Sequence, residues 1–454
     1  MKALLLSVSV GQGHNVAAQA ISDYIISQDS TSEVRIVDTL KYISPVLDKV
    51  LIGSYLSALQ VYPKAFTYLY SVFNKKDDSV LSLVEKLEEA ISWRILPLIR
   101  EMMPEVIIST HPFTTQMLSV LREDNKLNIP TLAIITDYGS HALWVHPGID
   151  YYVVAHESVV PEVVERGRSE DTVLPLGIPV RESFKQSFSR HDTLKKIGLD
   201  HEFLTVTLMG GSLALGNMKT ILKQLDSIQK PFNIVVVAGH NEKVYDEALE
   251  IALRSDKSIA VLKYCDFMGA LLQATDLLVT KPGGLTVTEA LITGTPLAIF
   301  KAIGGQEEQN RQFLLKHNLA IAIDNGENPA EKIESLLFHE NQLEAMRQRA
   351  ALAAKPNSSQ EIYHLLGQLI AQSSTNQEIA FVPELEEDGF TDKVKDIVEE
   401  LKEKLESNRA AASFMSIIRN RSHGTYLELT DEELKKLEDL SREGSPQKTR
   451  NEKE

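Results

Sequence analysis

The chain of 454 residues has little of several features that define other classes of protein. It has one cysteine, Cys265, which excludes a disulfide framework or a cysteine-rich metal site and suits a reducing compartment. No apolar run approaches the roughly 18 residues that a membrane-spanning helix needs. Positive charge is also scarce, with 47 Lys and Arg against 63 Asp and Glu, so no nucleic-acid partner is expected. These absences predict an acidic, cytoplasmic protein.

Short apolar runs alternate with longer helical patterns along most of the chain. The strand-like runs before residue 186 are 2–8, 33–38, 106–110, 131–136 and 151–155, and those after it are 203–209, 233–239, 276–280 and 296–300. Runs that are apolar throughout suit strands covered on both faces, and hence a parallel sheet. Two βαβ series in tandem predict an α/β protein with two doubly wound, Rossmann-like domains that face each other across a cleft.

Changes in composition predict three regions. We expect an N-terminal domain over residues 1–185, a C-terminal domain over 186–371, which a helix at 355–371 would close, and a charged helical tail over 372–454. The tail carries an apolar stripe at helical spacing (394–405), an arginine-containing apolar stretch (409–421) and a charged helix opened by Thr430 and Glu433. A solvated helix packed on the body and a membrane or partner contact are both open interpretations of it.

The first apolar run ends in a glycine loop that leads directly into a helical pattern. Gly11, Gly13 and His14 lie in this loop, where the backbone can approach a ligand and a helix N-terminus attracts anions. A dinucleotide-binding loop with Asp38 as the ribose acid is the alternative, but Val16 stands where the third glycine of that motif would be.

Three more glycine turns follow strands of the second domain, at the edge where open α/β sheets bind ligands. The candidate ligand-binding residues in them are Gly210, Gly211, Ser212, Gly283, Gly284, Thr286, Glu289, Gln306, Glu307 and Asn310. If a helix begins near residue 285, Glu289 lies about one turn inside it and could accept hydrogen bonds from both ribose hydroxyls. Backbone N–H groups and Thr286 would meet phosphate, while the amide and carboxylate groups of 306–310 suit sugar hydroxyls.

Two sets of motifs resemble a known family. KPGG-LT-TEAL--GTPLAI followed by GGQEEQN is similar to the donor-binding half of inverting GT-B glycosyltransferases, within the branch of monogalactosyldiacylglycerol synthases and processive diacylglycerol glucosyltransferases. SVSVGQGH--AA-AI and the residues from Ile134 to Asp150 resemble that branch's glycine loop and its T-D…H-x-x-W-x-H signature. The resemblance covers about residues 1–370. One position departs from it, because Gln12 stands where the family loop usually has a glycine.

The resemblance implies an activity and roles for particular residues. It implies transfer of glucose or galactose from a UDP-sugar to diacylglycerol, without a cofactor or metal, with His14 as the base that deprotonates the acceptor hydroxyl. The alternative for His14 is a hydrogen bond to the loop backbone only. The implied acceptor-binding residues are Gly13, Asp137, His141 and Trp144. The alternative functions are a UDP-N-acetylglucosamine 2-epimerase, which shares the two-domain plan, a silent sugar-nucleotide binder, or transfer to a polyprenyl-linked acceptor.

The residues between 137 and 150 also suggest a metal site as an alternative. Asp137, His141, His146 and Asp150 are all capable ligands. However, two histidines five residues apart with Trp144 between them match no trusted zinc spacing, so no metal site is predicted.

The segment 41–103 is rich in aromatic residues and slightly basic. Its aromatic residues include Tyr55, Tyr62, Phe66, Tyr68, Tyr70, Phe73 and Trp93, and lysines 64, 75 and 76 lie among them. This mixture suits a surface that docks on a membrane and lifts a lipid acceptor from it, although each aromatic alone could equally belong to a helical core. We therefore expect a cytoplasmic protein that associates peripherally with the inner face of the cell membrane.

Overall fold

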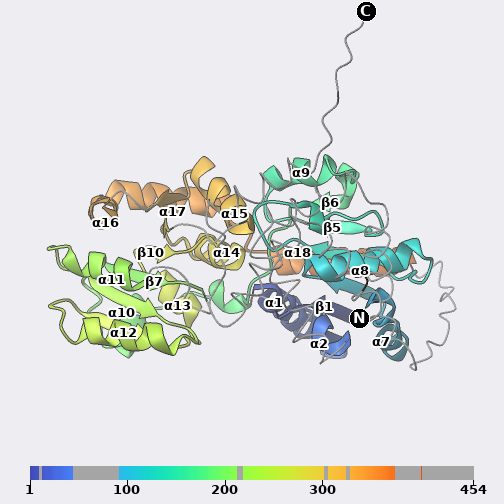
Figure 1. The fold of residues 1–454 in the computed structure, drawn as a ribbon, viewed down its shortest axis with the longest axis horizontal. Coiled ribbons are helices and arrows are strands. Elements are labelled where there is room, and N and C mark those ends of the chain that lie inside the picture. The colour runs from blue at the N-terminus through green and yellow to red at the C-terminus, as the bar shows by residue number, and fades with distance from the viewer. Residues whose placement is uncertain are drawn as a thin grey trace, which may run out of the picture. The chain divides into compact units, whose positions relative to one another are not determined.

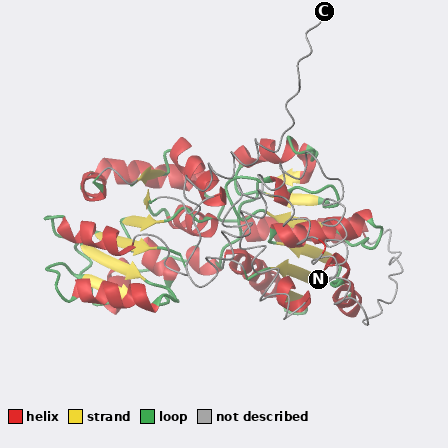
Figure 2. Ribbon diagram, in the orientation of Figure 1, coloured by secondary structure: helices red, strands yellow, loops and turns green. Residues whose placement is uncertain are grey.

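The computed structural model describes residues 1–9, 13–43, 91–211, 218–300, 305–323 and 328–373 and residue 400. Its contacts divide the chain into two units, one of Met1–Ser44 and Pro97–Ala380, the other of Pro45–Leu96 and Phe381–Glu454. The first unit contains both sheets (Figures 1 and 2). Most of the aromatic segment and nearly all of the tail lie outside the described residues.

The first sheet has six parallel strands in the order β2-β1-β3-β4-β5-β6. The strands are β1 (Lys2–Ser7), β2 (Glu33–Asp38), β3 (Val106–Ser109), β4 (Thr131–Ile134), β5 (Tyr151–Val153) and β6 (Val173–Leu174). The described α-helices between them are α1 (Gly13–Gln28), α2 (Thr39–Ile43), α7 (Leu96–Met102), α8 (Pro112–Glu123) and α9 (Val160–Val164). Single 3-10 turns span Ala142–Trp144, Glu157–Val159, Glu170–Thr172 and Glu182–Phe184.

The second sheet also has six parallel strands, in the order β12-β11-β10-β7-β8-β9. The strands are β7 (Thr205–Met209), β8 (Asn233–Val237), β9 (Ile259–Leu262), β10 (Leu277–Thr280), β11 (Leu297–Ile299) and β12 (Ala320–Ala322). Its helices are α10 (Arg190–Lys196), α11 (Met218–Ser227), α12 (Glu242–Ala252), α13 (Met268–Gln273), α14 (Gly284–Thr293), α15 (Gly305–Lys316), α16 (Pro329–Leu337) and α17 (Glu340–Ala353).

Successive residues of the second sheet's strands enter two different cores, as the period of two in a strand requires. Val236 of β8 packs with α11, α12, α16 and α17, whereas its neighbours Val235 and Val237 pack with α10, α13, α14 and α15. Helices therefore cover both faces of the sheet, which is why its strands are apolar throughout. The predicted fold of two doubly wound parallel sheets is confirmed. The boundaries at 185/186 and 371/372 stay predictions.

The last described helix, α18 (Ser358–Ser373), has the predicted position but not the predicted partner. We expected it to close the second domain, and the structure instead packs it on the first sheet. Ile362, Leu366 and Leu369 join a core with Ile21 of α1 and Leu5 of β1. An apolar side chain at every third or fourth residue of α18 predicts that one face of the helix is buried. The spacing does not show which sheet that face packs against.

Three strands were not among the expected runs, β6, β9 and β12, although Leu174 of β6 begins a stretch, 174–180, that is strand-like in sequence. Each has two to four residues and lies near or at a sheet edge, where short runs give little periodic signal. They complete six strands in each sheet.

Candidate active site

Each sheet has one point where the chain reverses its direction of strand addition, and ligands of open α/β sheets bind there. In the first sheet the point lies between the carboxyl ends of β1 and β3, which lead to His14 and Thr110 respectively. In the second sheet it lies between β7 and β10, which lead to Gly210 and Lys281. Strand order alone therefore brings together residues that lie far apart in the sequence.

His14 lies in the first turn of α1, which follows β1, and its side chain contacts the segment that follows β3. Its Nδ1 lies 2.7 Å from the carbonyl oxygen of Thr110, and only 7 % of the residue is exposed. Because a carbonyl oxygen only accepts hydrogen bonds, Nδ1 carries the proton and Nε2 keeps its lone pair. Burial lowers the pKa of His14 to about 4, against the opposing effect of the Thr110 hydrogen bond. The imidazole is therefore neutral at physiological pH, with one nitrogen free to accept a proton.

The alternative for His14, a hydrogen bond to the backbone, describes Nδ1 correctly, and it does not exclude the base role. The two functions use different nitrogens of one ring. The backbone bond fixes the tautomer in which the other nitrogen is basic.

His111, which was not among the predicted residues, lies directly against His14. The two rings meet edge to face with centroids 4.6 Å apart. His111 caps the N-terminus of α8, where its Nδ1 accepts the backbone N–H of Phe113 at 3.2 Å. Burial holds the pKa of His111 well below its usual range, and the nearby His14 lowers it further. A histidine followed by proline after a buried strand is a helix-start signal that could have identified it.

The predicted acceptor residues lie around the same histidines, but in different environments. Gly13 begins α1, and the position of a Cβ on it would be 3.6 Å from Leu285 of the second sheet's half. Trp144 has no exposed surface, its ring is 6.2 Å from that of His14, and its Nε1 has no hydrogen-bond partner in the described part of the chain. His141 is partly buried, and burial lowers its pKa to about 3, with the charge of Arg166 acting in the same direction.

Two of the four possible metal ligands, Asp150 and His146, are engaged by separate protein partners. Asp150 accepts hydrogen bonds from Arg122, at 2.6 Å, and from both the N–H and the hydroxyl of Thr131. His146 Nε2 lies 2.9 Å from the carbonyl oxygen of Leu143. Among the described residues no group of three or more His, Cys, Asp or Glu side chains is placed to hold a metal ion.

Asp38, the ribose acid of the dinucleotide alternative, is engaged by neighbouring side chains. Lys41 forms an ion pair with its carboxylate at 2.9 Å, and Ser9 donates a short hydrogen bond to it. The same Ser9 hydroxyl accepts a hydrogen bond from Asn15 at 3.0 Å. The group that a ribose would need is therefore occupied by protein donors.

The second sheet's half presents glycine turns, a helix N-terminus and a lysine. Gly211 has φ of +74°, a left-handed conformation that favours glycine, and a Cβ there would lie 2.9 Å from Cε of Lys281. Lys281 makes a short ion pair with Glu307. Lys281 was not among the predicted site residues, although it is the first charged residue after the buried strand β10. Ser212 and Gln12, and the side chain of Gln306, lie outside what the structure describes.

Helix α14 begins at Gly284, one residue before the earliest expected position, and the N-cap Gly283 supplies no side-chain cap. Among the described residues, no side-chain cap hydrogen bond is made to the N-terminus of this helix. Thr286 lies in this first turn, and Glu289 follows one turn later, as predicted. Burial raises the pKa of Glu289 to about 8, partly offset by the positive charge of Arg181.

The loop after β4 lies directly against helices α14 and α15 of the second half. Asn310 Nδ2 donates to Asp137 Oδ1 at 2.9 Å, and Asn310 Oδ1 accepts the N–H of Tyr138 at 2.6 Å. Burial raises the pKa of Asp137 to about 6, and the Asn310 hydrogen bond opposes that effect. A Cβ on Gly284 would lie 2.1 Å from the carbonyl oxygen of Thr136. Asp137, expected near the acceptor, thus contacts α15, which belongs to the second sheet's half.

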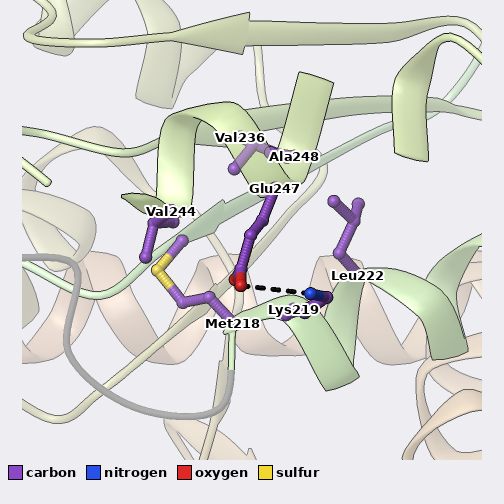
Figure 3. Close-up of a pocket in the computed structure, with 7 residues that line it drawn as sticks. All are labelled: Met218, Lys219, Leu222, Val236, Val244, Glu247 and Ala248. Carbon is purple, nitrogen blue, oxygen red and sulfur yellow. Dashed lines mark hydrogen bonds and ion pairs between the residues drawn. The ribbon is translucent and has the colours of Figure 1, made fainter. Parts of the chain in front are cut away.

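One hollow in the second sheet's half lies away from these residues (Figure 3). It is lined by Met218, Lys219, Leu222, Val236, Val244, Glu247 and Ala248, from α11, β8 and α12. Lys219 and Glu247 form an ion pair at 3.1 Å across it. Its cavity volume is about 10 Å³, roughly the space of one water molecule and far below the roughly 300–1,000 Å³ of typical ligand sites.

Two doubly wound sheets with their ligand-binding edges joined in this way define the GT-B class of fold. MurG of Acinetobacter baumannii is similar in structure, with a TM-score of 0.53 and 14% identity over 81% of this chain and 99% of that one. A UDP-GlcNAc 2-epimerase from Neisseria meningitidis, solved with UDP-GlcNAc bound, gives a TM-score of 0.51 and 14% identity over 81% and 100%. At these identities the likeness shows the fold alone.

Sequence comparisons identify the family. The model described as monogalactosyldiacylglycerol (MGDG) synthase matches residues 14–180, and that of the glycosyltransferase family 28 C-terminal domain matches 205–366. A processive diacylglycerol beta-glucosyltransferase of Bacillus pumilus (strain SAFR-032) is 30% identical over 80% of this chain and 93% of its own length. The chain belongs to this family of diacylglycerol glycosyltransferases, and it is a glycosyltransferase. Within the described residues no helix is both long and apolar enough to cross a membrane.

Proposed function

We propose that the protein transfers glucose or galactose from a UDP-sugar to diacylglycerol with inversion, without a metal ion. The observation that carries the proposal is the state of His14, a buried neutral imidazole whose Nδ1–H is held by Thr110 so that Nε2 can accept a proton. The name of the Bacillus pumilus relative supports diacylglycerol as the acceptor.

In the proposed reaction His14 Nε2 removes the proton from the acceptor hydroxyl. The hydroxyl oxygen then forms a bond to C1 of the hexose, and the bond between C1 and the β-phosphate oxygen breaks. The electron pair of that bond leaves with UDP. Lys281 and the first-turn N–H groups of α14 stabilise the charge on the departing diphosphate, because they lie at the carboxyl edge of the second sheet. The imidazolium later releases its proton to solvent.

We assign the donor to the second half and the acceptor to the first. In this assignment Gly210, Gly211, Ser212, Gly283 and Gly284 place backbone around the diphosphate, Thr286 contacts phosphate and Glu289 accepts the ribose hydroxyls. Gln306 and Glu307 contact the hexose. Gly13, His141 and Trp144 line the acceptor side. Because Trp144 has no exposed surface here, its contact with a lipid would require the neighbouring side chains to move.

The test uses the full chain with radiolabelled UDP-glucose and UDP-galactose in separate reactions. Each donor is offered to diacylglycerol vesicles, to vesicles that carry a polyprenyl phosphate instead, and to vesicles without an acceptor. We expect one donor to label diacylglycerol, in the presence of EDTA as well as in its absence. Label on the polyprenyl lipid alone, or conversion of the donor to an epimer without any labelled lipid, would contradict the proposal.

The proposed location is the inner face of the cell membrane, with the aromatic segment 41–103 as the docking surface. This part rests on the sequence pattern. Replacing Phe66 and Phe73 with serine should lower vesicle binding while the affinity for UDP stays the same. Vesicle sedimentation measures the first quantity and calorimetry the second. Equal sedimentation of the variant and the wild type would exclude this surface.

A further inference from the structure

The side chain of Asn310 is used almost completely by protein partners. It has no exposed surface. Its Nδ2 donates to Asp137 Oδ1 at 2.9 Å and to the carbonyl oxygen of Pro282 at 3.0 Å, and its Oδ1 accepts the N–H of Tyr138 at 2.6 Å. A carboxamide has two N–H donors, and both are taken. The partners also fix the orientation of the amide, because Pro282 can only accept and the Tyr138 N–H can only donate. A sugar hydroxyl therefore has little of this group left to bind.

Other contacts fasten the same loop to the same two helices. The Tyr138 ring stacks on Phe313 of α15 with centroids 4.4 Å apart, and its hydroxyl lies 3.0 Å from that of Thr288 in α14. A Cβ on Gly284 would overlap the Thr136 carbonyl oxygen, so only glycine permits the approach. Residues 136–138 are thus held between α14 and α15, the helices that carry the proposed donor-binding residues.

The loop also contacts the proposed base. The Thr136 hydroxyl oxygen lies 2.9 Å from His14 Nδ1. Because that nitrogen donates its proton to the Thr110 carbonyl, the hydroxyl oxygen acts as a second acceptor for the same N–H. Thr136 precedes Asp137 and Tyr138 directly, so a shift of the two residues that Asn310 holds moves the residue that touches the imidazole.

We propose that Asn310 is a positioning residue rather than a ligand of the donor sugar: its amide holds the 136–138 loop on helix α15, and Thr136 of that loop orients His14. The inference rests on the proposed role of His14 as the base. In this arrangement a residue of the proposed donor half, Asn310, sets the orientation of the His14 imidazole in the proposed acceptor half. Misplacement of a reacting group by about 1 Å costs on the order of 100-fold in rate, which sets the scale of the effect.

The first experiment exchanges the two side chains of the central hydrogen bond. Asn310→Asp removes both N–H donors and brings two carboxyl groups together. We expect turnover to fall about 10- to 100-fold, with the Kd for UDP and the KM for the UDP-hexose within about twofold of wild type. Adding Asp137→Asn restores the hydrogen bond with its direction reversed, because the amide now lies at position 137 and the carboxylate at position 310. The double variant should recover about tenfold of the lost turnover. Gln312→Glu, the same chemical change on the exposed face of α15, is the matched control and should leave all three quantities unchanged.

The second experiment observes His14 without using activity. Imidazole 15N spectra of the full chain, with the His14 signals assigned by their absence in His14→Gln, report the tautomer and the protonation of the ring. We expect the wild type to show the Nδ1–H tautomer between pH 6 and pH 8, and Asn310→Asp to shift these signals or mix the tautomers. The exchanged double variant should return them toward wild type, and Gln312→Glu should not change them.

The outcomes separate this inference from the proposed function. If the wild type transfers no hexose to any lipid, the proposed function fails, and the spectra still decide whether Asn310 orients His14. A rise of the KM for the UDP-hexose in Asn310→Asp with unchanged turnover would make Asn310 a donor ligand and overturn the inference. Unchanged His14 signals in that variant would overturn it as well, whether turnover falls through lost stability or stays at the wild-type level.

Discussion

The two sheets differ in the groups that they carry at the point where strand order reverses. The first carries buried, uncharged side chains, and the second carries backbone donors and a lysine. At the first sheet, burial lowers the pKa values of His14, His111 and His141, so that three imidazoles lie together without charge. At the second sheet, a glycine turn, an uncapped helix N-terminus and Lys281 provide backbone donors and positive charge. In the proposed function the first half accepts a proton and the second holds an anion, although both follow the same strand-to-helix plan.

The first prediction concerns which of the two sheets helix α18 packs against and stabilises. Leu366 is fully buried with the core of the first sheet. Leu366→Ala should lower the free energy of unfolding by about 2–5 kcal/mol, because it removes buried methyl groups and leaves a cavity. Urea denaturation measures the loss. Hydrogen exchange should show weakened protection in β1 and β3 and unchanged protection in β7 and β8. Weakening confined to the second sheet would reverse the assignment.

The second prediction tests whether the positive charge of the donor half serves the diphosphate. Lys281→Met keeps the length of the side chain and removes its charge, and the Kd for UDP should rise about tenfold because a charge-assisted contact is lost. Calorimetry measures this Kd. Lys219→Met is the matched control, since Lys219 pairs with Glu247 in the hollow of Figure 3, and it should bind UDP like the wild type. Equal affinity in both variants would remove Lys281 from the donor site.

The third prediction concerns pH, and its expected effect is a few-fold. Burial raises the pKa of Glu289 to about 8, so the free protein holds a proton there at neutral pH. A carboxylate accepts two ribose hydroxyls better than the protonated acid does, so the affinity for UDP should rise from pH 6.5 to pH 8.5. Glu289→Gln should remove this part of the pH dependence. An equal slope in both proteins would show that Glu289 does not take part.

The same group predicts a trend in stability. An unfolded glutamate ionises near its ordinary pKa, so between about pH 4.5 and pH 8 the folded protein binds a proton that the unfolded chain has lost. The contribution of Glu289 to the free energy of unfolding therefore decreases as pH rises through this range. Urea denaturation of the wild type and Glu289→Gln at pH 5 and pH 8 measures it, and the difference between the two proteins should be larger at pH 8.

The sequence predicts the sheets well because their central strands are mostly apolar and fully buried, and it therefore also predicts which loops lie at the carboxyl edges. His14, Gly211 and Glu289 are placed by this reasoning alone. Contacts that depend on how elements pack were not predictable. Thr110 and His111 follow β3 but touch His14 because β3 lies beside β1. Asp137 and Asn310 are 173 residues apart, and only the packed structure shows that they share a hydrogen bond.

The central claim is that the first half supplies the base and the second half holds the donor. The most direct measurement compares wild type and His14→Gln in one preparation each, recording both UDP affinity and labelled diacylglycerol product. The account predicts equal affinity for UDP and a loss of product formation of about 100- to 10,000-fold in the variant. Product formation at the wild-type rate in His14→Gln would contradict it.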